Sequence, residues 1–342
     1  MHAATFREHG GPEVMRWEEL ADPVPASDEV IVEVRACGLN HSDLDSRAGT
    51  SRWPFPLPWV LGAEFAGTVA AVGLEVEGIS PGDPVTAYQQ YACGTCRACV
   101  RWRQDLCERF VVFGTDRWGG YAELAAVPAR AVIPLRGEDD FVPAAAAQCV
   151  ASTAWSMVVT LAAVRSGETV LVPSASGGVA SAAVQAARIA GARVIASVGA
   201  PEKVDAVRAL GADVVFCYRD TPLAEVVSEA TGGRGVDVVV DTTGGPRFGE
   251  HLAAMAPDGR LVTCGAHAGE IVPLDIIELF RRGRRILGFR VASPDEIRAA
   301  LQMALEGRIA VPVDRTFPLS AAGDAHAYMD ERRHVGKIVL VP

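Results

Sequence analysis

Four cysteines lie close together in the stretch CGTCRACVRWRQDLC, residues 93 to 107. They are Cys93, Cys96, Cys99 and Cys107, with the spacing Cys-x2-Cys-x2-Cys-x7-Cys. Four thiolates can close a tetrahedral zinc site without leaving an open coordination position, so such a zinc is structural rather than catalytic. An iron–sulfur cluster uses the same type of ligand and is the chemical alternative. We predict one structural zinc ion per chain.

The stretch CGLNHSDLD, residues 37 to 45, is a second group of side chains that could do chemistry. It holds one cysteine, one histidine and two aspartates, and all three residue types bind metal ions in proteins. Its composition therefore raises a catalytic metal site as a hypothesis.

The segment VPSASGGVASAAVQAARIAGA places a turn of small residues between an expected strand and an expected helix. Gly177 and Gly178 let the backbone approach a diphosphate, whose charge the N-terminus of the helix stabilises. The motif alone is weak, because a tight turn without a ligand has the same pattern. Its place before five further strands of the right kind favours a dinucleotide site.

The end of the second expected strand, SVGAPEK, indicates which dinucleotide is bound. An NAD-binding chain usually carries an acidic residue there, which binds the ribose hydroxyls. This chain has Val198 and Gly199 at that point, and Lys203 could attract a 2′-phosphate. We therefore favour NADPH. The alternative is that Lys203 is only a solvated helix residue.

Two kinds of unit must position these groups. Up to about residue 135, short alternating or apolar runs between turn residues predict a β-rich unit. Beyond it, six hydrophobic strands alternate with amphipathic helices, which predicts an α/β fold with a doubly wound parallel Rossmann sheet. The expected strands are 169–173, 193–198, 213–218, 236–241, 260–265 and 284–290. The tail from about 292 returns to short strands and is expected to rejoin the first unit.

The length of 342 residues fits about two domains, and the formal net charge is −10 without a basic run. That charge argues against nucleic acid or an anionic membrane as a partner. The start MHAATFREHGG is not a secretory signal, so we expect a cytoplasmic protein. Residues 141–164 carry no charge but are alanine-rich and contain Pro143 and Gln148. We expect two buried helical pieces there rather than a membrane span.

Together, CGLNHSDLDSRAG, LGAEFAGTVAAVG, PGDPV, the four-cysteine lobe, GGYAE and SASGGVA resemble the medium-chain dehydrogenase/reductase superfamily. The similarity covers nearly the whole chain and is greatest to the quinone reductase and related zinc-binding oxidoreductase branch. It implies a GroES-like catalytic domain over 1–150, a Rossmann domain over 151–291 and a C-terminal return over 292–342. It also implies an active site between the two domains.

The resemblance allows each ligand position of a catalytic zinc to be compared with the residue in this chain. In the alcohol dehydrogenases of the superfamily, three residues bind the catalytic zinc. The matching positions here hold Asn40, Ala63 and Cys149, so two of the three ligands are missing. A substitute site made of Asp43, Glu64 and Cys149 is a minor alternative.

For catalysis, the resemblance implies that Asn40 faces the nicotinamide and that Ser42 and Asp45 match a proton relay. Burial would make Asp45 a feasible acid, since it raises the pKa of a carboxyl group. A surface turn residue is the alternative for Asp45. Several relatives that reduce carbon–carbon double bonds have a tyrosine there, so this chain lacks a tyrosine-type proton donor at that position. His41 matches a contact to the cofactor phosphates.

For cofactor binding, the resemblance implies several groups. The diphosphate would lie at Ser176, Gly177, Gly178 and Val179. The 2′-phosphate and adenine side would meet Lys203 and Tyr218. The nicotinamide end would be lined by Thr153, Asp241, Cys264 and Gly265, and Lys337 matches a C-terminal cofactor contact.

We therefore predict an oxidoreductase that transfers hydride from NADPH to a quinone or an α,β-unsaturated carbonyl without a catalytic zinc. A zinc-dependent alcohol dehydrogenase with unusual ligands and a non-catalytic NADPH-binding protein are the alternatives. Aromatic residues that could shape a pocket are Trp53, Phe55, Trp59, Tyr91 and Trp118. The sixth strand would be an open sheet edge, which suggests a homodimer.

Overall fold

The computed structural model describes residues 1–54, 56–137 and 140–342. The chain forms two compact units. The first consists of Met1–Cys149, Ser293–Leu305 and Pro312–Pro342, and the second of Val150–Ala292 and Glu306–Val311. The boundaries expected from the sequence were 150/151 and 291/292. Phe55, one of the predicted aromatic residues, lies outside the described residues.

The first unit is built mainly from β-strands. Its seven-stranded sheet has the order β10-β6-β5-β3-β18-β17, and β9 also pairs with β3. Smaller sheets join β2, β1 and β4, and β7 and β8. The strands are β1 His2–Phe6, β2 Arg16–Glu19, β3 Glu29–Gly38, β4 Trp59–Val60, β5 Glu64–Val72, β6 Pro84–Ala87, β7 Gln90–Tyr91, β8 Val111–Val112, β9 Leu124–Pro128, β10 Val132–Pro134, β17 Val313–Pro318 and β18 Lys337–Val341.

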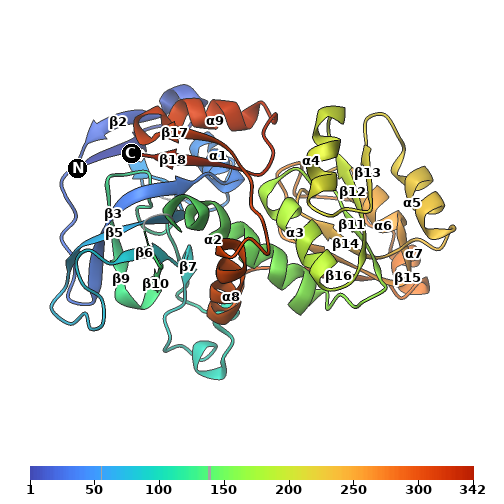
Figure 1. Ribbon diagram of the computed structural model, residues 1–342, viewed down its shortest axis with the longest axis horizontal. Coiled ribbons are helices and arrows are strands. Elements are labelled where there is room, and N and C mark those ends of the chain that lie inside the picture. The colour runs from blue at the N-terminus through green and yellow to red at the C-terminus, as the bar shows by residue number, and fades with distance from the viewer. Residues whose placement is uncertain (55, 138–139) are drawn as a thin grey trace. The chain divides into compact units, whose positions relative to one another are not determined.

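The C-terminal strands complete this sheet, as the pattern of short strands in the tail predicted. β18 pairs antiparallel with β3 and parallel with β17, so it lies inside the sheet rather than at its edge. In Figure 1 the red strands β17 and β18 accordingly run beside the blue segments of the N-terminal part. The helices of the first unit are α1 His41–Ala48, α8 Pro294–Leu305 and α9 Ala322–Asp330, and the boundary between the units falls within α2 Phe141–Trp155.

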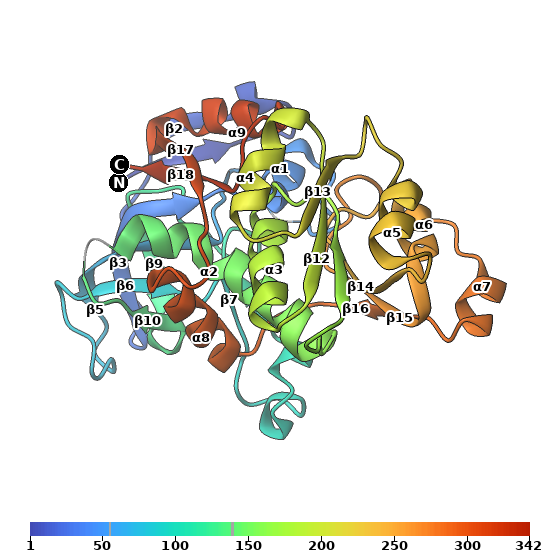
Figure 2. The same cartoon turned by 45° about the vertical axis from the view of Figure 1, so that its right-hand side comes forward.

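The second unit is the predicted doubly wound parallel sheet. Its six strands are all parallel, in the order β13-β12-β11-β14-β15-β16. They are β11 Thr169–Val172, β12 Arg193–Val198, β13 Val214–Cys217, β14 Val236–Asp241, β15 Met255–Thr263 and β16 Arg285–Gly288. The helices are α3 Gly178–Ile189, α4 Val204–Ala209, α5 Leu223–Thr231, α6 Phe248–Ala253 and α7 Ile276–Arg281. Figure 2 shows α3 and α4 on one side of the sheet and α5 and α6 on the other.

The core of the second unit explains why its strands could be recognised. The central strands bury nearly every side chain, because helices cover both faces of the sheet. Leu171, Ile195, Val239 and Leu261 come from four neighbouring strands and belong to one apolar cluster. Such strands read as continuous hydrophobic runs in the sequence.

The expectation of two helical pieces over 141–164 was wrong. One continuous helical stretch runs from Phe141 to Leu161, α-helical as far as Trp155 and π-helical beyond it. Pro143 does not interrupt it, because it lies in the first turn, where the backbone needs no N–H donor. By length and composition alone this helix could span a membrane, but 72% of its most apolar window is buried inside the structure, as in a core helix.

Candidate active site

The stretch CGLNHSDLD is the end of β3, a helix cap and the first turn of α1. Asn40 is the N-cap of α1, and its N–H donates to Asp43 Oδ2 at 2.8 Å. This backward hydrogen bond is half of a capping box, which satisfies a donor at the helix start. The helix then directs Ser42 outward and Asp43 into the core, and Asp45 is half-buried. The residues that looked like one cluster therefore point in different directions.

A buried ion pair lies directly behind Asn40. Lys337 Nζ, on β18, is 2.9 Å from Glu64 Oε2, on β5, and both side chains are buried. The same ammonium donates to Asn40 Oδ1 at 2.8 Å and to the carbonyl oxygen of Leu39. All three N–H donors of Lys337 thus have protein acceptors. The cofactor contact suggested for Lys337 by its sequence position stays a prediction.

Backbone packing brings α2 close to this ion pair. Glu64 Oε1 accepts the backbone N–H of Cys149 at 2.6 Å. Gly38 permits this approach, because a β-carbon on it would lie 2.1 Å from the carbonyl oxygen of Ala145. Both oxygens of the Glu64 carboxylate are therefore bound within the first unit.

The residues of the suggested second metal site make other contacts in the structure. Asp43 accepts from backbone N–H groups, Glu64 pairs with Lys337, and Cys149 offers its backbone to Glu64. Within the described part of the chain, the only group of three or more His, Cys, Asp or Glu side chains close enough to share a metal is the four-cysteine group. These contacts do not favour the alternative of a metal held by Asp43, Glu64 and Cys149.

A chain of hydrogen bonds leads inward from Asp43. Arg47 Nη1 lies 3.3 Å from His326 Nδ1, His326 Nε2 lies 3.1 Å from the Tyr121 hydroxyl, and that hydroxyl lies 3.5 Å from Asp43 Oδ2. Arginine can only donate, so Nδ1 accepts and the ring proton is on Nε2. The imidazole then donates to Tyr121, and Tyr121 donates to Asp43. The direction of the whole chain follows from the arginine.

Burial shifts the pKa of two members of this chain, Asp43 and His326. Desolvation raises the pKa of Asp43 to about 6, although the N–H of Asn40 and the charge of Lys337 oppose the shift. Desolvation and the nearby charge of Arg47 lower the pKa of His326 to about 3. His326 is therefore neutral at neutral pH, in agreement with the tautomer derived from its contacts.

The four cysteines fit the predicted structural zinc. Their ligand atoms all lie within 4.8 Å of one another, with Sγ–Sγ distances of 3.5 Å for Cys96 to Cys99 and 3.9 Å for Cys96 to Cys107. Four sulfurs around a tetrahedral zinc would be about 3.8 Å apart. Backbone N–H groups, that of Thr95 first, lower the pKa of Cys93 to about 5, so one thiolate is already favoured.

In the second unit, the small-residue turn lies at the start of α3, as predicted. Gly177 is the N-cap of the helix, and a β-carbon there would meet only the carbonyl oxygen of Ser174, at 3.6 Å. Ser176, Gly178 and Val179 are half-exposed, so this backbone is accessible. The first N–H groups of a helix are free to bind an anion. The turn therefore fits a diphosphate.

The two residues predicted for the 2′-phosphate side follow neighbouring strands. Lys203 comes after β12 and Tyr218 after β13, and these strands are paired. Lys203 is only 8% exposed, so it is not the solvated helix residue of the alternative interpretation. The Tyr218 hydroxyl would lie 2.8 Å from a β-carbon on Gly199, and the guanidinium of Arg247 lies 4.3 Å from the centre of the Tyr218 ring.

Three of the residues predicted for the nicotinamide end, Asp241, Cys264 and Gly265, lie at or just after the ends of β14 and β15. Asp241 Oδ1 accepts the N–H groups of Thr243 and Gly244, and Asp241 Oδ2 lies 2.6 Å from His251 Nδ1. Its carboxylate therefore stabilises the TTGG turn by accepting backbone N–H groups of that turn. Cys264 follows β15, the strand paired with β14, and burial raises its pKa to about 12. A side chain on Gly265 would meet the carbonyl oxygen of Thr242 at 2.1 Å.

Three predicted residues remain to be placed. Thr153 is buried in α2, within the second unit. His41 and Asp45 lie on α1 and are half-buried. Ser42 and Asp45 are three residues apart on this helix, so their side chains share one face. Their catalytic and cofactor-binding roles stay predictions.

The aromatic residues divide into two groups. Trp59 and Tyr91 are buried in the first unit, and the Trp59 indole N–H donates to the carbonyl oxygen of Gly114 at 2.8 Å. Both side chains pack into their own unit, which does not favour a role for them in shaping a substrate pocket. Trp53 and Trp118 are exposed and stay candidates.

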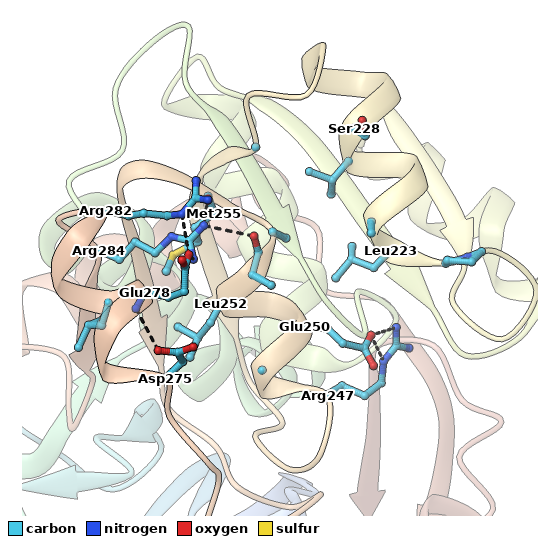
Figure 3. A pocket seen from close by; sticks show the side chains of 18 of the residues that line it. Leu223, Ser228, Arg247, Glu250, Leu252, Met255, Asp275, Glu278, Arg282 and Arg284 are labelled. Atoms are coloured by element: carbon cyan, nitrogen blue, oxygen red, sulfur yellow. Dashed lines mark hydrogen bonds and ion pairs between the residues drawn. The ribbon is translucent and has the colours of Figure 1, made fainter.

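A pocket of about 1250 Å³ lies elsewhere, among α5, α6 and α7 of the second unit. Figure 3 shows two ion pairs among its charged side chains, Arg247 with Glu250 and Arg282 with Glu278. Of the predicted site residues only Tyr218 lines it. We therefore do not assign the reaction to this pocket.

Sequence reasoning missed most of the buried network. Arg47, Tyr121 and His326 were not singled out, and Asp43 and Glu64 were considered only as metal ligands. Tyr121 lies in the GGYAE motif, which gave a weak signal. Arg47 lay unnoticed in the same motif as Asn40, and no local pattern marks His326.

Comparison with known families supports the two-unit arrangement. The model of the alcohol dehydrogenase GroES-like domain matches residues 26–137. The zinc-binding dehydrogenase model matches residues 178–306. The β-rich first unit is thus GroES-like, as predicted.

Individual relatives cover almost the complete chain. The quinone oxidoreductase of Sus scrofa is 30% identical, over 100% of this chain and 98% of its own. The acryloyl-coenzyme A reductase of Metallosphaera sedula is 32% identical, over 94% and 95%. A crystal structure described as an NAD-dependent alcohol dehydrogenase superposes with a TM-score of 0.95 at 39% identity, over 100% of both chains.

The four-cysteine group generates a first prediction. Replacing Cys99 with serine should reduce bound zinc from about one ion per chain to nearly none, because a hydroxyl is a poor ligand beside three thiolates. Elemental analysis of the purified protein measures this. The Cys217→Ser variant is the control, because Cys217 is buried in β13 and should leave the zinc content unchanged. Equal zinc in both variants, or iron in the wild type, would contradict the assignment.

Asp43 and His326 generate a second prediction, on stability against pH. The raised pKa of Asp43 contributes stability below pH 3.8 that is lost as pH rises through about 6. About 2 pKa units correspond to about 3 kcal/mol in the free energy of unfolding. The lowered pKa of His326 acts oppositely, since its stability is lost as pH falls from 6.5 through about 3.

The Asp43→Asn variant separates the two effects. It keeps an acceptor for the N–H of Asn40 but cannot ionise, so its stability relative to wild type should increase between pH 4 and pH 7. Urea unfolding at several pH values measures the difference. A difference that does not change with pH would show that Asp43 does not titrate in this range.

Proposed function

Because the chain belongs to the medium-chain dehydrogenase/reductase superfamily, in its quinone reductase-like branch, we propose that it is an NADPH-dependent reductase of quinones or α,β-unsaturated carbonyls. The chain is an oxidoreductase of this superfamily, and the coenzyme and acceptor are the proposal. The names of two relatives, a quinone oxidoreductase and an acryloyl-coenzyme A reductase, support both acceptor types.

The observation that carries the proposal is the cluster of Asn40, Glu64 and Lys337. At the positions that bind a catalytic zinc in the alcohol dehydrogenases, this chain offers the amide of Asn40 and the methyl group of Ala63. These groups do not fit a zinc ion. The buried carboxylate of Glu64 is instead paired with an ammonium. Acceptors that take a hydride without a Lewis acid suit such a site.

The second unit fits the coenzyme. Ser176, Gly177, Gly178 and Val179 would hold the diphosphate, Lys203 and Tyr218 the 2′-phosphate and adenine side, and Thr153, Asp241, Cys264 and Gly265 the nicotinamide end. NADPH supplies the hydride when bound. Holding donor and acceptor in the reactive geometry can contribute roughly 7 to 11 kcal/mol to lowering the barrier.

The first unit would stabilise the negative charge that develops on the acceptor and would supply the proton. The carboxamide of Asn40 can donate to the oxygen on which charge develops, as oxyanion-binding groups do. Ser42 and Asp45, on one face of α1, would then pass a proton to that oxygen or to the adjacent carbon. His41 would contact the cofactor phosphates. The structural zinc has no part in these steps.

The coenzyme and acceptor are tested together. Purified protein should oxidise NADPH faster than NADH with at least one member of a panel of quinones, enones and aldehydes. Replacing Lys203 with methionine should raise the KM for NADPH by about tenfold or more, corresponding to about 1.4 kcal/mol, and change the KM for NADH little. Equal preference in wild type and variant would argue against a role for Lys203.

Other outcomes of the same assay favour the alternatives. Turnover of simple alcohols that stops on chelation, with two zinc ions per chain, would indicate a zinc-dependent alcohol dehydrogenase. Tight NADPH binding without turnover of any acceptor would indicate a coenzyme-binding protein. One structural relative is described as NAD-dependent, so the NADH arm is essential.

We also propose a homodimer formed through the edge of the parallel sheet. β16 is the last strand in the sheet order. Near it in sequence, the helix α7 exposes apolar side chains, with Ile276 at 58% and Phe280 at 65% exposure. An open strand edge beside exposed apolar groups is commonly covered by a second subunit. We expect the second copy of this chain to cover it.

Charge on α7 should therefore separate the subunits. The Phe280→Glu variant should have the mass of a monomer in light scattering after gel filtration, whereas the wild type should have that of a dimer. Leu74→Glu is the matched control, because Leu74 is 99% exposed in the first unit. A wild type that is monomeric at micromolar concentration would contradict the dimer.

A further inference from the structure

Asn40 and the lysine that contacts it are residue types that this chain rarely uses. Of its 32 Lys and Arg residues only two are lysines, Lys203 and Lys337, and Asn40 is its single asparagine. Both lysines are buried, with Lys337 only 3% exposed. Lys337 and Asn40 are in direct contact. One of two lysines thus touches the only asparagine, which the proposed function places at the reacting groups.

The geometry at Lys337 suits an ammonium group. Its three N–H donors meet the carbonyl oxygen of Leu39, Asn40 Oδ1 at 2.8 Å and Glu64 Oε2 at 2.9 Å. An ammonium is a compact charge with three donors, whereas a guanidinium is planar and larger. A buried place with three acceptors around one atom therefore selects lysine over the arginine that this chain uses elsewhere.

The ion pair fixes the carboxamide of Asn40 from both ends. Lys337 donates to Oδ1, and Asn40 Nδ2 donates to Glu64 Oε2 at 3.2 Å. The ammonium can bind only the oxygen of the amide, and the carboxylate can bind only its NH2 group. The reverse orientation would place the amide NH2 against the ammonium and the amide oxygen against the carboxylate. The amide plane is therefore fixed without a direct role for substrate or coenzyme.

This arrangement leaves one donor available. An asparagine amide has two hydrogens, and one is engaged by Glu64. The second has no acceptor among residues 1–54, 56–137 and 140–342, and Asn40 is half-exposed. Because Lys337 withdraws electron density from the amide oxygen, it strengthens the remaining N–H as a donor.

We propose that Lys337 is a positioning residue of the reduction site: its ion pair with Glu64 orients and polarises the Asn40 carboxamide so that the free N–H meets the oxygen of the acceptor. The inference rests on the proposed function, and it assigns Lys337 a role other than the coenzyme contact suggested by its sequence position. Lys337 would act only through Asn40.

The first test needs no turnover. Protein labelled with 15N-asparagine gives a single side-chain amide group in NMR spectra, because Asn40 is the only asparagine. In the wild type, its two hydrogens should have separate shifts and the hydrogen bound to Glu64 should exchange slowly with water. In Lys337→Met the signals should move towards those of a free carboxamide, and exchange should become faster. Lys203→Met, which removes the other lysine, should leave them unchanged.

The second test separates positioning from stability. Lys337→Met should lower kcat by on the order of 10-fold to 100-fold and also lower the melting temperature, because Glu64 is left unpaired. The double variant Lys337→Met with Glu64→Gln has no unpaired buried charge, so its melting temperature should recover largely. Its kcat should stay low, because the amide of Asn40 is still not held.

A double-mutant cycle completes the test. In an Asn40→Ala background, Lys337→Met should reduce kcat by less than about twofold, since its effect passes through the missing amide. Recovery of kcat together with stability in the double variant would overturn the proposal, as would an undiminished effect of Lys337→Met in Asn40→Ala. Asn40 amide signals that are the same in the wild type and in Lys337→Met would overturn the proposal as well.

Failure of the proposed function would look different. If the wild type reduces no quinone, enone or aldehyde while the Asn40 signals respond to Lys337→Met, the positioning of the amide stands and the assigned reaction falls. If the wild type is active and the signals do not respond, the reaction stands and the role of Lys337 falls.

Discussion

A carboxylate that is fully buried must meet a cation and hydrogen-bond donors within the fold, and in the first unit this constraint is set by Glu64. Its two oxygens receive the ammonium of Lys337, the amide of Asn40 and the backbone N–H of Cys149. These groups come from β18, the N-cap of α1 and α2, so one side chain of β5 ties three other segments together. Removing one member of a buried ion pair typically costs 3 to 5 kcal/mol. The position of Asn40 therefore follows from electrostatics inside the unit.

The second unit obeys a different constraint. Its parallel strands all end at the same edge, so the turns after β11 to β15 gather there. The glycines at 177, 199 and 265 lie after three of these strands, and at 199 and 265 another group of the unit occupies the space of a side chain. The edge of the sheet where these turns lie is thus formed by the parallel strand arrangement and by small residues. The cluster around Asn40 in the first unit is instead held by a buried ion pair.

Much of this could be predicted from the sequence. All six strands of the parallel sheet were expected, because strands buried on both faces appear as hydrophobic runs such as TVLV and VDVVVD. The four-cysteine group and the turn at Gly177 were also recognised, since local spacing determines both. The helix from Phe141 was expected as two pieces, because Pro143 and Gln148 break the alanine-rich stretch.

The contacts that position Asn40 could not be predicted, because they join segments far apart in the chain. Lys337 is 273 residues from Glu64, and Tyr121 is 205 residues from His326. Trp59 was expected at a pocket, but it is buried in β4, and its indole N–H donates to the distant carbonyl oxygen of Gly114. Buried polar partners of this kind follow from three-dimensional packing and leave no local pattern.

The position of Lys337 in the chain also has a consequence for biosynthesis. During translation, the strand that carries Glu64 is made before the second unit, and β18, which supplies its cation, is made after it. The whole second unit is synthesised in between and has every strand of its own sheet before Lys337 appears. Until then, the first unit holds a carboxylate that cannot be buried at low cost. The parallel sheet can therefore fold before this ion pair exists, whereas the cluster around Asn40 cannot be completed until β18 has been made.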